Sequence, residues 1–308
     1  MEVKTFYNGN TMPQIGLGTF RVENDENCME SVKYAIEQGY RSIDTAKVYG
    51  NEEQVGAGIR AGLESTGIAR EDLFITSKLY FEDFGRENVA AAYEASLSRL
   101  GLKYLDLYLV HWPGTNEAVM VDTWKGMEDL YKNNKAKNIG VSNFEPEHLE
   151  ALLAQVSIKP VINQVEYHPY LTQHKLKLYL AAQHIVMESW SPLMNAQILN
   201  DETIKDIAQE LGKSPAQVVL RWNVQHGVVI IPKSVTPNRI SENFQIFDFE
   251  FGFMHCCLKE HAEQSSHSYS LKSRLKPYLS LRYAYLLKPI LLLLGHINSS
   301  LSSSYFQF

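Results

Sequence analysis

Short apolar runs alternate with longer amphipathic segments along most of the chain. The short runs predict strands, and the segments whose apolar residues recur near the helical period predict helices. Strands are expected at Ile15–Gly18, Ser42–Asp44, Leu73–Leu79, Leu105–His111, Asn138–Ser142, Val161–Glu166, Ile185–Trp190 and Val228–Pro232. Helices are expected at Asn27–Gln38, Glu52–Glu64, Val89–Leu100, Val121–Lys132, from Pro146 onward, His174–Gln183, Glu202–Leu211, Ser214–Gln225 and Thr236–Phe247.

Two of the predicted helices carry recognisable start sequences. Ser214-Pro-Ala-Gln217 has the spacing of a capping box, with proline at the first helical position. Asn143 is expected to cap the helix that has Pro146 in its first turn.

The alternation of strands and helices predicts a parallel sheet, and about eight β/α units predict that it closes into a (β/α)8 TIM barrel. The alternative is an open doubly wound sheet. Its dinucleotide-binding sequence, G-x-G-x-x-G after the first strand, is absent, because Gly16-Leu-Gly18 is followed by Thr-Phe-Arg. The barrel is therefore the favoured fold class.

Composition adds few constraints on function. The 308 residues are 45% hydrophobic and 21% charged, with a net charge of −6, which argues against a general nucleic-acid binder. Three cysteines form no disulfide framework, and the N-terminus has no apolar signal sequence. A reduced, cytoplasmic setting is expected.

The composition changes after residue 250. The first 250 residues hold 23 Lys and Arg against 33 Asp and Glu, whereas residues 251–308 hold six Lys and Arg against two Glu. We therefore expect a barrel domain over residues 1–250 and an aberrant, disordered tail over residues 251–308.

Polar residues of four chemical types follow successive predicted strands. Asp44, Lys78 and His111 end strands, and Tyr49 lies in the loop after the second strand. Barrel enzymes carry their chemistry at the carboxyl ends of the strands, so these four side chains are expected to meet. Each alone has an ordinary structural explanation, and their common placement is what favours a site.

The four side chains suit the protonation of a carbonyl oxygen. Tyr49 can donate the proton, although a free phenol, with a pKa near 10, is a weak acid. Lys78 is expected to lower that pKa, with Asp44 holding the ammonium in place, and His111 can hydrogen-bond the substrate oxygen.

A second polar cluster follows the last predicted strand. Lys233, Ser234 and Arg239 surround the start of a helix, whose free N–H groups favour anions. Barrels often bind phosphate near the last two strands, and two cations suggest more than one phosphate. Trp190, at the end of the seventh strand, can stack on a flat ring.

Several motifs of the chain resemble those of the aldo-keto reductases, over about residues 3–250. They include Asp44-Thr-Ala-x-x-Tyr49-Gly-Asn-Glu52, Asp106-Leu-Tyr-Leu-Val-His111-Trp-Pro113, Gly140-Val-Ser-Asn-Phe144 and Ile231-Pro-Lys-Ser-Val-Thr-Pro237. The resemblance is greatest to bacterial reductases of the diketogluconate and glyoxal/methylglyoxal type.

The resemblance implies an NADPH-dependent reductase of small aldehydes and ketones, with a tetrad of Asp44, Tyr49, Lys78 and His111 and Tyr49 as the proton donor. It implies a small carbonyl substrate as the partner, no nucleic acid or membrane, and a monomer. The implied cofactor-binding residues are Thr19, Ser142, Asn143, Gln164, Trp190, Ser191, Pro192, Leu193, Lys233, Ser234, Val235, Arg239, Glu242 and Asn243. The implied substrate-pocket residues are Phe20, Tyr80 and Trp112.

The chain departs from this resemblance after Glu250. We interpret the abrupt change as a frameshift or read-through near codon 251, with loss of the loop that selects substrate in the family. Two other functions are therefore kept open: a cofactor-binding barrel with impaired catalysis, and a lyase or aldolase that uses Lys78 in a Schiff base.

Two features of the tail bear on whether it binds a metal or spans a membrane. Its histidines and cysteines, such as Cys256 and Cys257, fit no standard zinc spacing, so no metal site is expected. The apolar run Tyr283–Gly295 is shorter than the 20 or so residues that a membrane span needs.

Overall fold

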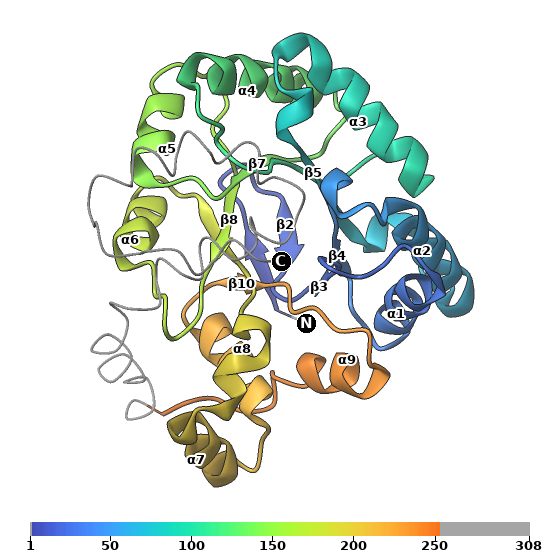
Figure 1. Cartoon of the computed structure of the whole chain (residues 1–308), viewed down its shortest axis with the longest axis vertical. Helices are drawn as coiled ribbons and strands as arrows, with labels where there is room; N and C mark the ends of the chain where they lie inside the picture. The colour runs from blue at the N-terminus through green and yellow to red at the C-terminus, as the bar shows by residue number, and fades with distance from the viewer. Residues whose placement is uncertain (1, 253–308) are drawn as a thin grey trace, which may run out of the picture. The chain divides into compact units, whose positions relative to one another are not determined.

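The computed structural model describes residues 2–252. Eight parallel strands surround a central axis, and helices form a ring outside them (Figure 1). The strands are β3 (Leu17–Gly18), β4 (Ser42–Asp44), β5 (Phe74–Leu79), β6 (Leu107–Val110), β7 (Ile139–Ser142), β8 (Ile162–Glu166), β9 (Val186–Trp190) and β10 (Val229–Ile230). The helices are α1 (Glu26–Glu37), α2 (Glu52–Thr66), α3 (Arg86–Leu100), α4 (Glu117–Lys132), α5 (Pro146–Leu153), α6 (His174–Ala182), α7 (Glu202–Leu211), α8 (Pro215–Gln225) and α9 (Pro237–Phe244).

The sheet is in sequence order from β3 to β10, as repeated right-handed β/α units require. Parallel bridges join Ile15 to Ile230 and Gly18 to Lys233, so the first strand segment also meets the last. The predicted (β/α)8 barrel is confirmed, and most predicted strands and helices agree with the structure within a few residues.

Glycine at position 18 makes the closure possible. The Gly18 amide donates to the Pro232 carbonyl at 3.1 Å. A Cβ atom at this position would lie 2.6 Å from the Ile231 carbonyl oxygen. Real Cβ atoms essentially never come this close to a backbone atom. The seam of the barrel therefore depends on a residue without a side chain.

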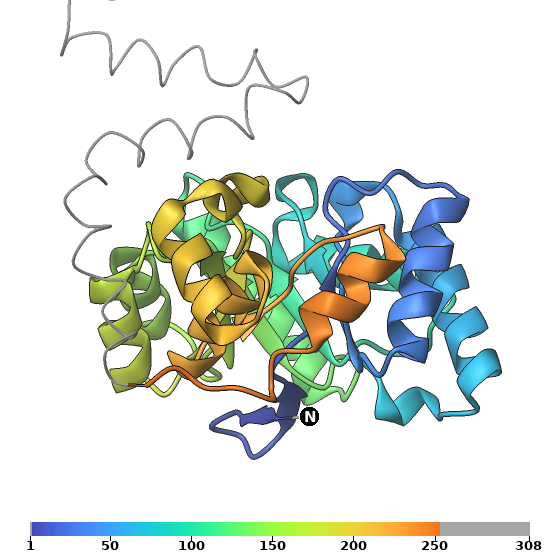
Figure 2. The same ribbon diagram turned by 90° about the horizontal axis from the view of Figure 1, so that it is seen from below.

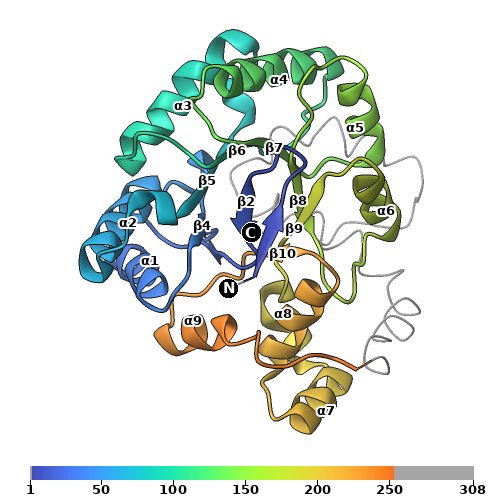
Figure 3. The ribbon, with the colours of Figure 1, turned by 180° about the vertical axis from the view of Figure 1, so that it is seen from behind.

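A hairpin of β1 (Val3–Thr5) and β2 (Thr11–Pro13) covers the bottom of the barrel (Figures 2 and 3). Phe6 and Met12 pack in one cluster with residues at or just before the start of several strands: Phe74, Leu107, Val161, Ile162 and Val229. Because those residues lie at the amino ends of the strands, the hairpin seals that end with apolar side chains. The carboxyl ends remain available for chemistry.

Helix starts agree with the sequence in one case and differ in another. Ser214 accepts a hydrogen bond from the Gln217 amide at 3.2 Å, which confirms the predicted capping box. The predicted cap at Asn143 is wrong, because Glu145 is the residue that precedes helix α5. Asn143 instead has a left-handed backbone, with φ of 65°, and its side chain turns toward the barrel mouth.

The tail predicted for residues 251–308 falls, except for Phe251 and Gly252, outside the described residues. The predicted absence of a metal site at its histidines and cysteines and the apolar run Tyr283–Gly295 fall there as well. Within residues 2–252, no group of His, Cys, Asp and Glu is arranged to bind a metal ion. No helix in this range is long and apolar enough to span a membrane.

The first prediction concerns the seam. Gly18→Ala should lower the free energy of unfolding by about 1–3 kcal/mol, as overpacking does, because the backbone of Ile231 must move away. Urea unfolding would measure the change. Gly252→Ala is the control and should be neutral, since no atom of residues 2–252 outside its chain neighbours lies within 4 Å of a Cβ atom at that position. Equal stability of the two variants would contradict this account of the seam.

Candidate active site

The four residues predicted to form a tetrad come together at the carboxyl end of the barrel. Lys78 is fully buried in β5, and its ammonium contacts the Asp44 carboxylate at 2.6 Å, the Thr45 carbonyl at 3.0 Å and the Tyr49 hydroxyl at 3.1 Å. The rings of Tyr49 and His111 meet edge to face, with their centroids 5.7 Å apart. Strands β4, β5 and β6 are adjacent, which explains why residues far apart in the chain form one cluster.

The Tyr49 loop is fixed by a buried amide. Asn51 donates hydrogen bonds to the Thr19 and Val22 carbonyls, both at 2.9 Å, and accepts one from the Thr45 hydroxyl at 2.9 Å. These bonds join the loop after β3 to the loop after β4. Tyr49 is therefore presented to Lys78 from a segment with little freedom to move.

The titration of Tyr49 differs from the prediction. Burial raises the pKa of the Tyr49 phenol to about 12, and the charge of Lys78 lowers it only in part. The sequence correctly identified the effect of the ammonium but could not reveal the larger cost of desolvating a phenolate. Tyr49 therefore keeps its proton across the neutral range.

Lys78 is charged and His111 is neutral. Burial alone lowers the pKa of the Lys78 ammonium, but Asp44 and Tyr49 outweigh it, so the net shift is upward. Burial, and then the charge of Lys78, lower the pKa of His111 well below its usual value. His111 is accordingly neutral, and its Nδ1 atom has no hydrogen-bond partner among residues 2–252.

A fifth titratable residue was missed by the sequence analysis. Glu188 is buried in β9, and the Gln164 amide donates to its Oε2 atom at 2.8 Å and to Asp44 Oδ2 at 2.9 Å. Burial, followed by the negative charge of Asp44, raises the pKa of Glu188 to about 8. The available clue was an acidic residue inside the apolar run Val186–Trp190.

Residues predicted to bind a cofactor line the same end of the barrel. Ser142 and Gln164 lie opposite each other on β7 and β8. Trp190 ends β9, and its partly exposed indole donates to the Asn143 side-chain oxygen at 2.9 Å. The N–H groups of Gln164 are directed to carboxyl groups, which leaves its side-chain oxygen for a ligand.

Lys233 and the start of α9 form a cationic edge next to the tetrad. Lys233 is exposed, and its backbone forms a parallel β-bridge with Gly18. Gly18 in turn pairs with Asp44 on the neighbouring strand β4. Arg239 is also exposed, and within the described residues neither cation forms an ion pair within 4.0 Å. No acidic residue stands in the first turn of α9, so its N–H groups are not neutralised.

The remaining predicted cofactor residues have the following positions. Thr19 is buried and donates to the Asp44 carbonyl at 2.9 Å. Ser191 has a φ of 52° directly after β9, and Pro192 and Leu193 follow it. Ser234 is buried, Val235 is exposed, and Glu242 and the buried Asn243 lie in α9.

Aromatic side chains border the tetrad. The Phe20 ring lies 5.0 Å from that of Tyr49, and the Tyr80 ring lies 5.6 Å from that of His111. Trp112 directly follows His111 and is partly exposed. The structure therefore brings Phe20 and Tyr80, two of the three predicted pocket residues, into contact with the tetrad.

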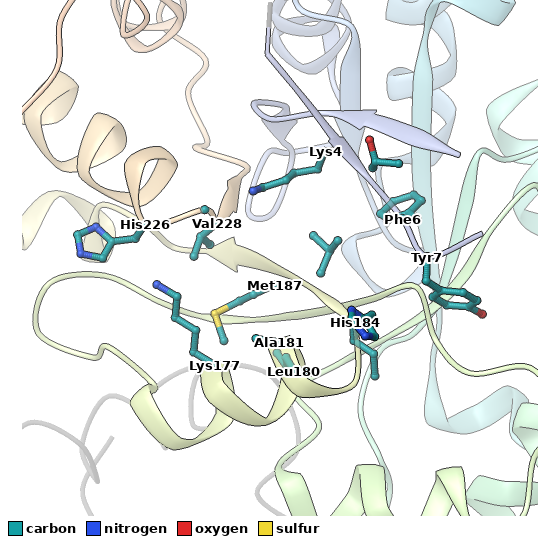
Figure 4. Close-up of a pocket in the computed structure, with 14 residues that line it drawn as sticks. Lys4, Phe6, Tyr7, Lys177, Leu180, Ala181, His184, Met187, His226 and Val228 are labelled. Carbon is teal, nitrogen blue, oxygen red and sulfur yellow. The ribbon is translucent and has the colours of Figure 1, made fainter. Parts of the chain in front are cut away.

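A separate cavity of about 630 Å³ lies at the opposite end of the barrel. Its walls include Phe6 and Tyr7 from the hairpin segment, Lys177 from α6 and Met187 near the start of β9 (Figure 4). None of the predicted site residues lines it. Because the chemical groups gather at the carboxyl ends, this cavity is not the candidate active site.

Comparison with known proteins identifies the family. The model of the aldo/keto reductase family matches residues 14–253. The chain belongs to the aldo/keto reductase family. This result confirms the predicted family and enzyme class. The chain is an NADP-dependent oxidoreductase of carbonyl compounds.

Individual relatives match over most of their length. The glyoxal reductase of Bacillus subtilis (strain 168) is 56% identical over 244 residues, which are 79% of this chain and 86% of the relative. Methylglyoxal reductase DkgA of Escherichia coli (strain K12) is 46% identical over 243 residues, or 78% and 86% of the two chains.

Solved structures agree with the barrel. An aldo/keto reductase from Brucella melitensis is 42% identical, with a TM-score of 0.80, over 84% of this chain and 98% of that one. The Bombyx mori aldo-keto reductase AKR2E4 in complex with NADP is 36% identical, with a TM-score of 0.79, over 85% and 92% of the two chains.

The second prediction concerns the stability of this aldo/keto reductase as the pH changes. The pKa of Glu188 rises from 4.5 to about 8 on folding, so the unfolded chain releases a proton that the folded chain holds. Unfolding therefore becomes easier as the pH rises between those values, by up to about 1.4 kcal/mol per pH unit. Glu188→Gln should remove this dependence, as urea unfolding at several pH values would show.

Glu128→Gln is a matched control. Glu128 is also buried, but hydrogen bonds from the Ile158 amide, Lys132 and the Ser157 amide outweigh burial and lower its pKa. Above the usual pKa range of a glutamate, Glu128 is ionised in both the folded and the unfolded chain. Its substitution should therefore shift the free energy of unfolding by a constant amount from pH 5 to 8. A wild-type stability that runs parallel to that of Glu188→Gln would contradict the predicted proton on Glu188.

Proposed function

We propose that the chain reduces small aldehydes and ketones to alcohols, with NADPH as the hydride donor and Tyr49 as the proton donor. The observation that carries this proposal is the contact of 3.1 Å between the Lys78 ammonium and the Tyr49 hydroxyl. A buried cation beside a phenol favours the negative charge that appears when the phenol gives up its proton. A carbonyl oxygen that receives a hydride at its carbon needs such a proton.

Tyr49 begins each turnover protonated, since its pKa lies near 12. The substrate oxygen becomes strongly basic only as the carbonyl is reduced, so proton transfer is favourable at that moment. The Lys78 N–H group then stabilises the phenolate that is left, and Asp44, at 2.6 Å from Lys78, keeps the ammonium in position.

His111 is suited to orient the carbonyl. Its imidazole is neutral, and the edge-to-face contacts with Tyr49 and Tyr80 hold the ring. A neutral imidazole can donate one N–H to the substrate oxygen without competing with Tyr49 as the acid.

The geometry disfavours the Schiff-base alternative. An amine attacks a carbonyl only when it is neutral, and buried Schiff-base lysines have a depressed pKa. The net shift of the Lys78 pKa is upward, and its ammonium donates to three oxygen atoms. Lys78 is therefore better suited to stabilise charge than to form a covalent bond.

The residues at the mouth of the barrel fit NADPH, which supplies the hydride when bound. The Trp190 ring, held by Asn143, offers a flat face to a nicotinamide. The oxygen of Gln164, with Ser142 and Asn143, can hydrogen-bond the carboxamide. Three groups of residues complete the site. Beside the pyrophosphate lie Ser191, Pro192 and Leu193. The 2′-phosphate is assigned to Lys233, Ser234, Val235 and Arg239, and the adenine to Glu242 and Asn243. Thr19 donates to the Asp44 backbone carbonyl and so helps to fix the end of β4.

The substrate proposal rests on the small aromatic border and on the relatives. Phe20, Tyr80 and Trp112 present flat apolar surfaces to the tetrad. The relatives with the names glyoxal reductase and methylglyoxal reductase are 56% and 46% identical to this chain. We therefore select glyoxal and methylglyoxal as the first substrates to test.

The third prediction concerns the proton donor. Tyr49→Phe should reduce turnover of methylglyoxal by about 10²–10⁴-fold, the usual contribution of general acid catalysis, because the substitution removes the hydroxyl that gives the proton. NADPH affinity should stay near that of the wild type. Absorbance at the NADPH band would report turnover, and quenching of protein fluorescence would report binding.

Three results would each overturn this function. Full turnover by Tyr49→Phe would exclude Tyr49 as the donor. Tight NADPH binding by the wild-type protein with no turnover of a panel of aldehydes would favour the impaired barrel. Trapping of a substrate on Lys78 by borohydride would favour the lyase.

The fourth prediction concerns cofactor choice. Lys233→Met and Arg239→Met should each weaken NADPH binding by about tenfold or more, as loss of a charge-assisted hydrogen bond to phosphate does. NADH lacks the 2′-phosphate, so its affinity should change little. Titration of each variant with both nucleotides would measure the ratio, and an equal loss for NADPH and NADH would contradict this assignment.

A further inference from the structure

One amide joins the carboxylate of the tetrad to a second buried carboxyl group. Gln164 Nε2 lies 2.9 Å from Asp44 Oδ2 and 2.8 Å from Glu188 Oε2. All three side chains are buried, with exposed fractions of 1%, 2% and 1% for Gln164, Asp44 and Glu188. Both N–H groups of the amide are thus committed to acceptors, as buried donors require.

The charges around this amide do not balance if both acids are ionised. The groups that act electrostatically on Glu188 within the described residues are Asp44 on β4, Tyr49 in the loop after β4, and Lys78 on β5. On its other side, β10 presents apolar Val229 at the position paired with Glu188. Among these groups of the described chain, Lys78 is the one cation, and it contacts Asp44 directly. Two negative charges beside one positive charge, away from water, are costly.

We propose that Glu188 is a positioning residue that stays protonated and, through the Gln164 amide, holds the Asp44 carboxylate against Lys78. The proposal rests on the function proposed above and adds a fifth residue to its proton-donating machinery. The neutral acid gives Gln164 an acceptor without competing for the charge of Lys78. Asp44 therefore remains the sole counter-ion of the ammonium that serves Tyr49.

The arrangement makes proton donation sensitive to alkaline conditions. Loss of the Glu188 proton places a second negative charge near Tyr49, which opposes formation of the phenolate. Tyr49 then holds its proton more tightly, and reduction slows. The raised pKa of Glu188, about 8, puts this change below the ionisation of Tyr49 itself.

The first measurement detects the proton directly. Infrared spectra of the purified protein, recorded between pH 5 and 10, report the carbonyl stretch of a protonated carboxylic acid. Wild type should show such a band that disappears with a midpoint near the predicted pKa of about 8. Glu188→Gln should lack the band, and Glu128→Gln, the buried but ionised control, should retain it.

The second measurement follows catalysis in a single turnover, with protein, bound NADPH and methylglyoxal, so that product release does not limit the rate. The wild-type rate should fall as the pH rises through the infrared midpoint. Glu188→Gln should lose that inflection, which gives it several-fold the wild-type rate at pH 9. Glu188→Met, which cannot accept from Gln164, should be slower than Glu188→Gln at every pH.

The outcomes separate this inference from the proposed function. Absence of the Glu188-dependent band, or pH profiles that coincide for wild type and Glu188→Gln, would overturn the positioning role. Equal rates for Glu188→Gln and Glu188→Met would reduce Glu188 to a packing residue. Full turnover by Tyr49→Phe would overturn the proposed function instead, while the infrared band would still report whether Glu188 carries a proton.

Discussion

The ion pair between Lys78 and Asp44 is the interaction on which the rest of the site depends. Both side chains are buried, and their charged atoms are 2.6 Å apart. A charge withdrawn from water in this way is tolerated only when it is paired and its remaining hydrogen bonds are made. Lys78 meets that condition through Thr45 and Tyr49, and Asp44 meets it through Gln164. The same bonds that make the pair tolerable also place a phenol beside a cation.

The barrel supplies the geometry for that pair. Asp44 and Lys78 come from adjacent parallel strands, and the register between them is fixed by backbone hydrogen bonds. The seam at Gly18 brings Lys233 and α9 around to the tetrad side. The apolar hairpin closes the other end, so water and ligands reach the polar groups from one side. Stability and chemistry are thereby separated between the two ends of the strands, as is usual in this fold.

Much of the barrel could be predicted from the sequence because each β/α unit repeats a simple pattern. Strand β4 was predicted with the bounds Ser42–Asp44 that the structure has, since polar residues and a turn delimit a short apolar run. The hairpin of β1 and β2 was missed because its strands have three residues each, too few for a periodic pattern. Its clue was Asn8-Gly9, a favoured hairpin turn, where Gly9 has a φ of 87°.

The candidate site was predictable in its members but not in its energetics. The order of strands was enough to bring Asp44, Tyr49, Lys78 and His111 together. It could not reveal that Asn143 binds Trp190 instead of capping a helix, which depends on one left-handed backbone angle. Nor could the order of strands reveal the role of Glu188. The pKa of an acid within an apolar strand depends on which groups face that acid across the barrel. Desolvation, which decides the pKa of Tyr49, is likewise a property of the folded molecule.

The most direct test of the central claim is the single-turnover rate of NADPH-dependent methylglyoxal reduction by Lys78→Met. NADPH binding, measured alongside, confirms that the barrel of this variant is folded. Binding should persist while the rate falls by about 10²–10⁴-fold, because the phenolate of Tyr49 loses the cation that stabilises it. A rate close to that of the wild type, with NADPH bound, would contradict this claim.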